Sequence, residues 1–289
     1  MPQLHRRGAF TKNLQFEFET LRGLSLDNAC DVQSRPHKLD AVGMVPKSIK
    51  KPSKHAYSMP TARRKNNDCE DAPPEFQHSL LFLAALAGDL YGVKLVIDCG
   101  VNPNIQNKDG DTPLHSAALN GNSEVVKLLL EHGADPNIQN KDGMTPLHFA
   151  TEYSPWHFAA RYSPWDSATE RGYLRVVKLL LEHGADPNIQ NKDGMTPLHF
   201  ATERGSPEVV KLLLEHGADP NIQENKFGWT PLHYAVSRCH VDVVRVLLDH
   251  GADLTIRDNK GMTPLDYGSD CEEIIEELRR GGSRTMVYE

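Results

Sequence analysis

The sequence has no long apolar run. Its longest uninterrupted apolar stretch, residues 80–87, is less than half of the ~20 residues that a helix needs to cross a bilayer. No apolar run follows Arg6 and Arg7, so the amino terminus does not resemble a secretory signal. We therefore expect a protein that neither spans a membrane nor is secreted.

Cysteine is scarce, and patterns that indicate catalysis are absent. The five cysteines are odd in number, widely spaced and never arranged as C-x-x-C; they are Cys30, Cys69, Cys99, Cys239 and Cys271. This spacing argues against a disulfide framework and a zinc site, and it favours an intracellular protein, cytoplasmic or nuclear. There is no glycine-rich phosphate loop and no Gly-x-Ser-x-Gly element. We expect no enzyme activity, no cofactor and no metal ion.

Charge is unevenly distributed along the chain. Residues 1–65 contain 13 lysines or arginines against 5 aspartates or glutamates, a net charge of +8, so the remaining 224 residues carry −15. Binding to a phosphate backbone requires lysine and arginine, which makes the acidic part a poor candidate for it. Any contact with nucleic acid is expected in the basic amino-terminal part alone.

Most of the chain is built from an internal repeat. Blocks that begin with a glycine and continue into Thr-Pro-Leu-His, or a close variant, are separated by 33, 51, 34 and 33 residues; they start at Gly110, Gly143, Gly194, Gly228 and Gly261. A period near 33 residues indicates a solenoid, in which each unit buries its apolar face against its neighbours.

The first of these blocks, which starts at Gly110, explains the structure of one unit. Thr112 is placed to cap a short helix whose first position is Pro113, where a missing N–H has no cost. Ser123 is placed to cap a second helix, and Gly133 can adopt the left-handed conformation that ends it. Each unit is therefore predicted to contain two antiparallel helices and a turn.

The Thr-Pro-Leu-His, Gly-Ala-Asp and Asp-Gly elements, at this spacing, resemble the ankyrin repeat family. The resemblance implies an all-α solenoid of helix-turn-helix units joined by β-hairpin turns. The predicted solenoid covers 77–282. A basic, mostly disordered segment at 1–76 precedes it, and a tail at 283–289 follows it. The six predicted repeats, of which the last reads as a polar cap, are 77–108, 109–141, 142–192, 193–226, 227–259 and 260–282.

The third repeat contains 18 surplus residues. Three nine-residue copies stand in tandem, beginning at Thr145, Ser154 and Ser163, and only one of them can dock in the stack. The surplus is expected to protrude between the two helices. Its Trp156 and Trp165 are either partner contacts or the product of a neutral duplication.

The recurring histidines are interpreted as structural. The imidazole of Thr-Pro-Leu-His is implied by the resemblance to bond to the backbone of the neighbouring repeat. Others stand near the ends of second helices, where a histidine interacts favourably with the last carbonyls; they are His132, His183 and His216.

The resemblance also implies a binding surface, at the tips of the turns and along the exposed edge of the first helices. The predicted function is a non-enzymatic, monomeric adaptor or scaffold that binds a protein partner there. Besides Trp156 and Trp165, the candidate partner-binding residues are Asp111, Met144, Met195, Lys226, Phe227, Trp229, Arg238 and Met262.

Two further hypotheses concern modification and the amino-terminal segment. Hydroxylation by an asparaginyl hydroxylase is implied by the resemblance at Asn137, Asn188 and Asn221, although a proline precedes each one. Basic residues resemble a bipartite nuclear import signal, or else belong to a solvated linker; they are Lys50, Lys51, Arg63, Arg64 and Lys65. The alternative function is therefore a nuclear regulatory protein whose basic tail contacts nucleic acid while the repeats recruit a protein.

Overall fold

The computed structural model describes residues 73–152, 166–268 and 271–285. The chain divides into two units, Met1–Ala62 and Arg63–Glu289, and all described residues belong to the second. Within them the elements alternate between a first and a second helix of each repeat. The first helices are α2 (Pro74–Ala87), α4 (Pro113–Leu119), α6 (Pro146–Glu152), α9 (Pro197–Arg204), α11 (Pro231–Ser237) and the 3-10 helix η2 (Pro264–Tyr267). The second helices are α3 (Leu90–Asp98), α5 (Ser123–Glu131), α8 (Asp166–Glu182), α10 (Pro207–Glu215), α12 (Val241–Asp249) and α13 (Glu272–Thr285).

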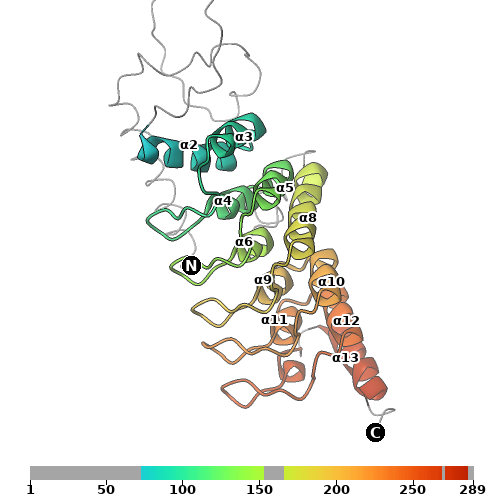
Figure 1. The fold of residues 1–289 in the computed structure, drawn as a ribbon. Coiled ribbons are helices and arrows are strands. Elements are labelled where there is room, and N and C mark those ends of the chain that lie inside the picture. The colour runs from blue at the N-terminus through green and yellow to red at the C-terminus, as the bar shows by residue number, and fades with distance from the viewer. Residues whose placement is uncertain (1–72, 153–165, 269–270, 286–289) are drawn as a thin grey trace, which may run out of the picture. The chain divides into compact units, whose positions relative to one another are not determined.

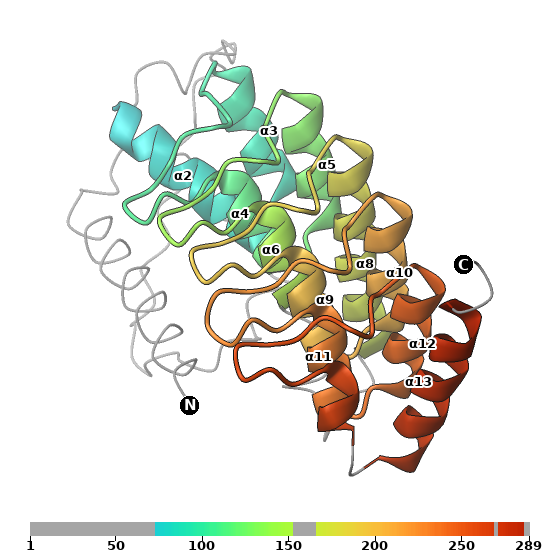
Figure 2. The same ribbon diagram turned by 90° about the horizontal axis from the view of Figure 1, so that it is seen from below.

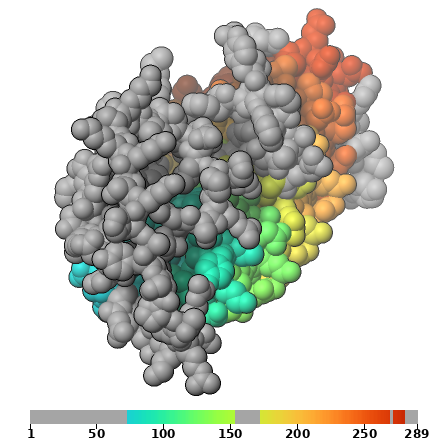
Figure 3. Space-filling model, turned by 90° about the horizontal axis from the view of Figure 1, so that it is seen from above, coloured from blue at the N-terminus to red at the C-terminus, as the bar shows by residue number. Residues whose placement is uncertain are grey.

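The helices form two parallel rows, with the turn tips on one side. Each first helix packs against the first helix of the next repeat, and each second helix against the next second helix. The tips leave the first-helix row together, as Figures 1 and 2 both show. In Figure 3 the described surface runs as a continuous band in chain order from cyan to orange. This is the predicted all-α solenoid.

The core is a column of equivalent side chains. The leucine of each Thr-Pro-Leu-His element is fully buried between consecutive repeats, as Leu114, Leu147, Leu198 and Leu232 all show. Burying one such side chain contributes about 1.5 to 3 kcal/mol, which is available only while the neighbouring repeat is folded.

The predicted helix starts are confirmed in the first helices and wrong in α5. Thr112 and His115 form a capping box at the start of α4, with Pro113 at the first helical position. Ser123 is inside α5 rather than its cap, and the N-cap residue is Asn122. The Asn122 amide instead donates to the Ala85 and Leu86 carbonyls at 2.9 and 3.0 Å, which ties this turn to the preceding repeat.

The tips are tight turns, and no strand occurs in the residues that the structure describes. In the second tip the Asn107 N–H donates to the Asp111 carbonyl at 2.9 Å, a hairpin-like closure too short to form a strand. Gly110 has φ +82°, and a Cβ there would lie 2.9 Å from the Lys141 nitrogen. Close approach of successive tips therefore requires glycine at this position.

In the third repeat the first of the three tandem copies docks in the stack. Thr145 opens α6, and Leu147 and His148 are fully buried. The last copy does not restart a first helix, because residues from Asp166 onward belong to the 17-residue helix α8. Trp156, Trp165 and the expected protrusion lie outside the described residues.

The expectation about cysteines is wrong at the carboxyl-terminal end. Cys239 and Cys271 form a disulfide, with their Cα atoms 6.2 Å apart and a sequence separation of 32 residues. Cys239 has φ +58°, a left-handed conformation that glycine adopts at the equivalent Gly205. Scattered spacing concealed this pair because the stack brings positions one repeat apart together.

Candidate functional site

Buried histidines form a ladder along the first helices. The Nδ1 atom of His115 accepts from the Thr112 N–H at 3.0 Å, and its Nε2 lies 3.0 Å from the Met144 carbonyl of the next repeat. Because Nδ1 is an acceptor, the proton of the neutral ring is on Nε2, which donates to that carbonyl. The same arrangement joins His148 to Met195, His199 to Trp229 and His233 to Met262. The neighbour-bonding role implied for the Thr-Pro-Leu-His imidazole is confirmed.

Burial keeps these histidines neutral. It lowers the pKa of His148 and of His199 from 6.5 to about 4, outweighing the carbonyl hydrogen bonds that favour the charged form. Each imidazole is also met edge-on by an aromatic ring of the next repeat, such as Phe149 against His115 at 5.5 Å between ring centres. The ladder is structural and offers no free proton acceptor to a substrate.

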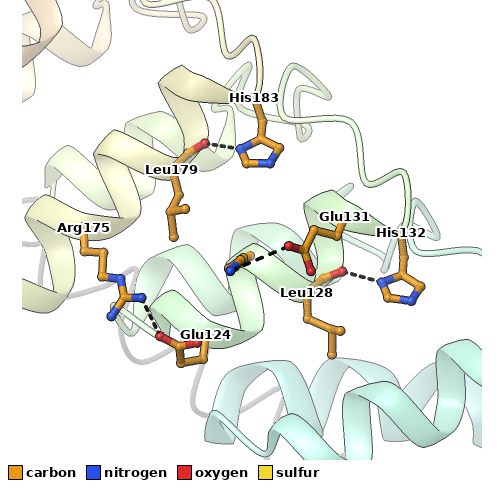
Figure 4. A network of polar contacts seen from close by, with 8 residues as sticks. Glu124, Leu128, Glu131, His132, Arg175, Leu179 and His183 are labelled. Carbon is orange, nitrogen blue, oxygen red and sulfur yellow. Dashed lines mark hydrogen bonds and ion pairs between the residues drawn. The ribbon is translucent and has the colours of Figure 1, made fainter.

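The histidines at the ends of second helices are confirmed as carboxyl-terminal caps. The Nδ1 atom of His132 lies 2.8 Å from the Leu128 carbonyl, and His183 is placed in the same way on Leu179 (Figure 4). An ion pair of 2.8 Å between Arg175 and Glu124 links the neighbouring second helices. This face is charged, exposed and locally balanced.

Neither a metal cluster nor a membrane-spanning helix occurs in the described part of the chain. No group of three or more histidine, cysteine or acidic side chains is arranged there to hold a metal ion. No helix there is both long enough and apolar enough to cross a membrane.

The structure corrects the candidate binding residues at the middle tips. Asp111 and Met144 are only 5% and 4% exposed, so neither is available to a partner. The Asp111 carboxylate accepts from the Asn140 amide at 2.8 Å, and the Met144 sulfur lies 3.3 Å from the Asn191 amide nitrogen. The residue after each tip glycine faces the next tip, which covers it. Met195 is partly buried for the same reason.

The last two tips differ from the others. Phe227 is 41% exposed and Met262 is 37% exposed, and both belong to the row of tips. The Lys226 ammonium lies 4.8 Å from the centre of the Phe227 ring. On the adjoining edge of the first helices, Arg238 is exposed and pairs with Glu203 at 2.8 Å. These four exposed residues, Lys226, Phe227, Arg238 and Met262, are together called the C-terminal tip surface.

Trp229 supports this surface from beneath. Its ring lies 5.1 Å from the Tyr234 ring and 5.0 Å from the Tyr267 ring, and its Nε1–H donates to Asp258 at 3.0 Å. Trp229, a candidate partner-binding residue, is therefore packed on the neighbouring tip. The Phe227 ring contacts it, with 5.7 Å between the ring centres.

Two buried carboxylates organise these tips, and the sequence did not mark them as functional. Glu224 is 3% exposed and accepts from the N–H groups of Lys226, Phe227 and Trp229. Burial alone would raise the pKa of Asp258, but hydrogen bonds from Tyr267, two backbone N–H groups and Trp229 lower it to about 2. Glu224 and Asp258 take the position that asparagine occupies in the other tips. This substitution was the one feature of the sequence that could have marked the two carboxylates.

The asparagines proposed for hydroxylation form a second ladder. The Asn137 amide donates to the Gly184 carbonyl and accepts from the Asp186 N–H, at 2.9 and 2.8 Å. Asn188 and Asn221 bond to the next repeat in the same way. Asn104 begins this ladder with equivalent bonds to Gly133 and Asp135 and was missed because its repeat is degenerate. The basic residues of the suggested import signal lie outside the described residues.

Comparison with known proteins agrees with this architecture. The family model for ankyrin repeats matches residues 81–162, 165–258 and 217–285. An ankyrin repeat domain from Acinetobacter baumannii AYE is similar at a TM-score of 0.59 and 28% identity, over 70% of this chain and 97% of that one. An ankyrin repeat protein of fowlpox virus (strain NVSL) is 61% identical over 33 residues, and one of Rickettsia felis is 70% identical over 27.

The two curated matches are local, while the family match extends over the array. They cover 11% and 9% of this chain and only 4% and 12% of the relatives themselves. The family match, in contrast, spans most of the chain and coincides with the stacked helix pairs and their histidine ladder. The chain belongs to the ankyrin repeat family.

Proposed function

We propose that this protein is a non-enzymatic adaptor or scaffold that binds a protein partner through its C-terminal tip surface. Ankyrin repeats are generally protein–protein interaction modules, and this family membership supports the general role. The single observation that supports the location is the exposure of Phe227 on the tip row, where its ring contacts the packed ring of Trp229.

Energetics favour this part of the tip row over the rest. The tips before it expose lysine and aspartate side chains, such as Lys141 and Asp142, and exposed ion pairs contribute only about 0 to 1 kcal/mol. Aromatic and arginine side chains dominate binding energy at interfaces, where they are held rigidly and desolvated. Phe227 is held by Trp229, and Arg238 is held by Glu203.

Cross-linking capture from a lysate, quantified by mass spectrometry, tests the location. Phe227→Ala combined with Arg238→Ala should reduce capture of the main partner by about tenfold or more, because these are the proposed anchors. The matched control is Tyr91→Ala on α3, which removes another exposed aromatic side chain, 77% exposed, far along the chain. Equal capture by the wild type and the double variant would contradict the proposed surface.

We further propose that the protein acts inside the cell as a monomer, in the cytoplasm or the nucleus. The Cys239–Cys271 bond stands against a strictly reducing setting, because disulfides persist mainly in oxidising compartments. The basic amino-terminal segment supports the alternative, a nuclear regulatory role with nucleic-acid contact. Salt-dependent binding of duplex DNA by the full chain, lost when the basic residues of 47–65 are neutralised, would favour that alternative.

Hydroxylation of Asn137, Asn188 and Asn221 is a separate proposal. Each amide already bonds to the next repeat, so a modifying enzyme requires local opening of the turn. An added hydroxyl would change stability by about 1 kcal/mol rather than create an active site. Peptide mass spectrometry after co-expression with an asparaginyl hydroxylase tests this, and no added oxygen at any of the three would contradict it.

A further inference from the structure

The last repeat was predicted to be a polar cap, but its tip and first helix expose an apolar face that, in the earlier repeats, the following repeat covers. Leu265 occupies the position of the fully buried leucines of the earlier Thr-Pro-Leu-His elements, yet it is 47% exposed. Met262 occupies the position of Met144, which is 4% exposed, and is itself 37% exposed. The equivalent buried residues of the earlier repeats therefore show which groups can pack against this face.

The series of backbone hydrogen bonds between successive tips also stops at the last repeat. Each tip donates one N–H to a carbonyl of the preceding tip at 2.9 to 3.0 Å, from Lys141 to Asp109, Lys192 to Asp142, Asn225 to Asp193 and Asn259 to Phe227. The next carbonyl in this series is that of Lys260. Among the described residues no N–H group bonds to it. The tip row thus ends in an unpaired acceptor beside two exposed apolar side chains, Met262 and Leu265.

In the earlier repeats, two kinds of group from the following repeat cover the equivalent face. A following tip supplies one backbone N–H to the carbonyl, and a following first helix supplies apolar side chains, such as Leu198 and the Phe200 ring that meets His148 edge-on. An occupant with the same chemistry would be an extended segment that has a free N–H and a large apolar side chain. Extended peptides bind in this way at exposed edges, where backbone bonds give affinity and side-chain contacts give specificity.

Exposed charge on the last two tips adds a further requirement. In the three tips before them an exposed lysine stands next to an aspartate, as Lys192 does next to Asp193. Phe227 takes that aspartate position in the fifth tip and Lys260 takes it in the sixth, while Glu224 and Asp258 are buried within their turns. The exposed charges of these two tips are therefore cationic, which favours a carboxylate in the occupant on the side of the tips, away from the exposed Asp266 of η2.

We infer that the open face of the last repeat, made of the Lys260 carbonyl, Met262 and Leu265, binds an extended partner segment. That segment places one large apolar side chain on Met262 and Leu265, donates a backbone N–H to Lys260 and carries a flanking acidic residue. This inference rests on the proposed function and names the kind of partner that the C-terminal end of the array recognises.

The test selects peptides from a random phage-displayed library on the full-length oxidised protein and measures the synthesised peptides by fluorescence anisotropy. Leu265→Glu and, as a second variant, Met262→Glu should each weaken binding by about tenfold or more. Both side chains are already partly exposed, so circular dichroism should show a folded array. Leu90→Glu, at an exposed leucine of α3, is the matched control and should bind as the wild type does.

A second arm tests the backbone bond. N-methylation at one peptide position next to the apolar residue should weaken binding by about tenfold, because it removes the N–H that Lys260 accepts, whereas methylation at the ends should not. Replacing the flanking acidic residue by its amide should weaken binding less at high salt.

Each other outcome overturns the inference. Peptides that lose binding with Phe227→Ala but not with Leu265→Glu would leave the proposed function intact and contradict this face. Failure of the library to yield any peptide sensitive to Leu265→Glu would contradict it equally. A concentration-dependent dimer by light scattering that disappears with Leu265→Glu would assign the face to a second copy of this chain instead.

Discussion

At the scale of single residues, the structure depends on buried polar groups that are neutral or fully bonded. The imidazoles of the ladder hold the start of one first helix and the tip of the next repeat at once, as His148 does between Thr145 and Met195. Asp266 takes the histidine position in the last repeat, where it caps Thr263 through two hydrogen bonds. An aspartate can accept but not donate, which suits a position with no following carbonyl to reach.

The ladder predicts a specific loss of stability in acid. Histidines whose folded pKa is lowered favour the folded state above their unfolded pKa of 6.5, and that stability is lost as the pH falls from 6.5 toward about 4. At pH 5 the loss should be roughly 2 kcal/mol for each of His148 and His199. Urea unfolding followed by circular dichroism at several pH values measures this slope.

A variant of the ladder checks this prediction. His148→Gln should make the slope shallower, because one titrating group is removed. Identical slopes for the wild type and His148→Gln would show that the buried imidazole does not stay neutral in the folded protein.

At the scale of elements, stability comes from contacts between neighbouring repeats. Leu213 in α10 is fully buried, and Leu213→Asp would place an unpaired charge there. We expect a loss of about 3 to 5 kcal/mol and the unfolding of flanking repeats as well. Lys211→Asp, on the exposed face of the same helix, should cost about 0.5 kcal/mol or less. A thermal melt unchanged by Leu213→Asp would contradict the packing of α10.

The tandem copies lead to a prediction about deletion. Removing residues 153–170 joins Glu152 to Arg171 and Gly172, which reproduces the local sequence Glu203-Arg204-Gly205 of the next repeat. Gly205 is left-handed with φ +74°, and Gly172 can adopt the same conformation. The shortened protein should melt at the same or a higher temperature, because an interrupted register becomes regular. A clearly lower melting temperature would show that the removed residues stabilise the array.

The repeat register explains which elements the sequence predicted and which it did not. Every Thr-Pro opening marked a first helix, because a capping threonine and a first-position proline act locally. The role of Asn122 was missed because its bonds run to the preceding repeat, and the exposure of Met144 was overestimated because the next tip covers it. Local chemistry was readable from sequence, whereas exposure depended on how closely the tips stack.

At the scale of the whole molecule, a covalent cross-link closes the carboxyl-terminal end of the array. The disulfide between Cys239 and Cys271 ties the fifth repeat to the start of α13. In the chain-entropy account, closing a loop of this length stabilises the folded state by about 3 to 4 kcal/mol. The left-handed conformation of Cys239 has a cost of about 1 kcal/mol or more, which the bond offsets.

Reduction should therefore loosen the last repeat. Trp229 reports on it by fluorescence, in a Trp156→Phe, Trp165→Phe background that removes the other two tryptophans. A thiol reductant should lower the melting temperature seen by Trp229, and Cys271→Ser should behave as the reduced protein does with or without reductant. A free thiol at both positions in the purified, unreduced protein would contradict the bond.

Amide hydrogen exchange of the full chain, alone and with the captured partner, tests whether the partner binds at the C-terminal tip surface. We expect protection at residues 226–229 and 258–265, the last two tips, with little change along the second helices. Protection confined to α5, α8 and α10, with the tips exchanging as in the free protein, would contradict it.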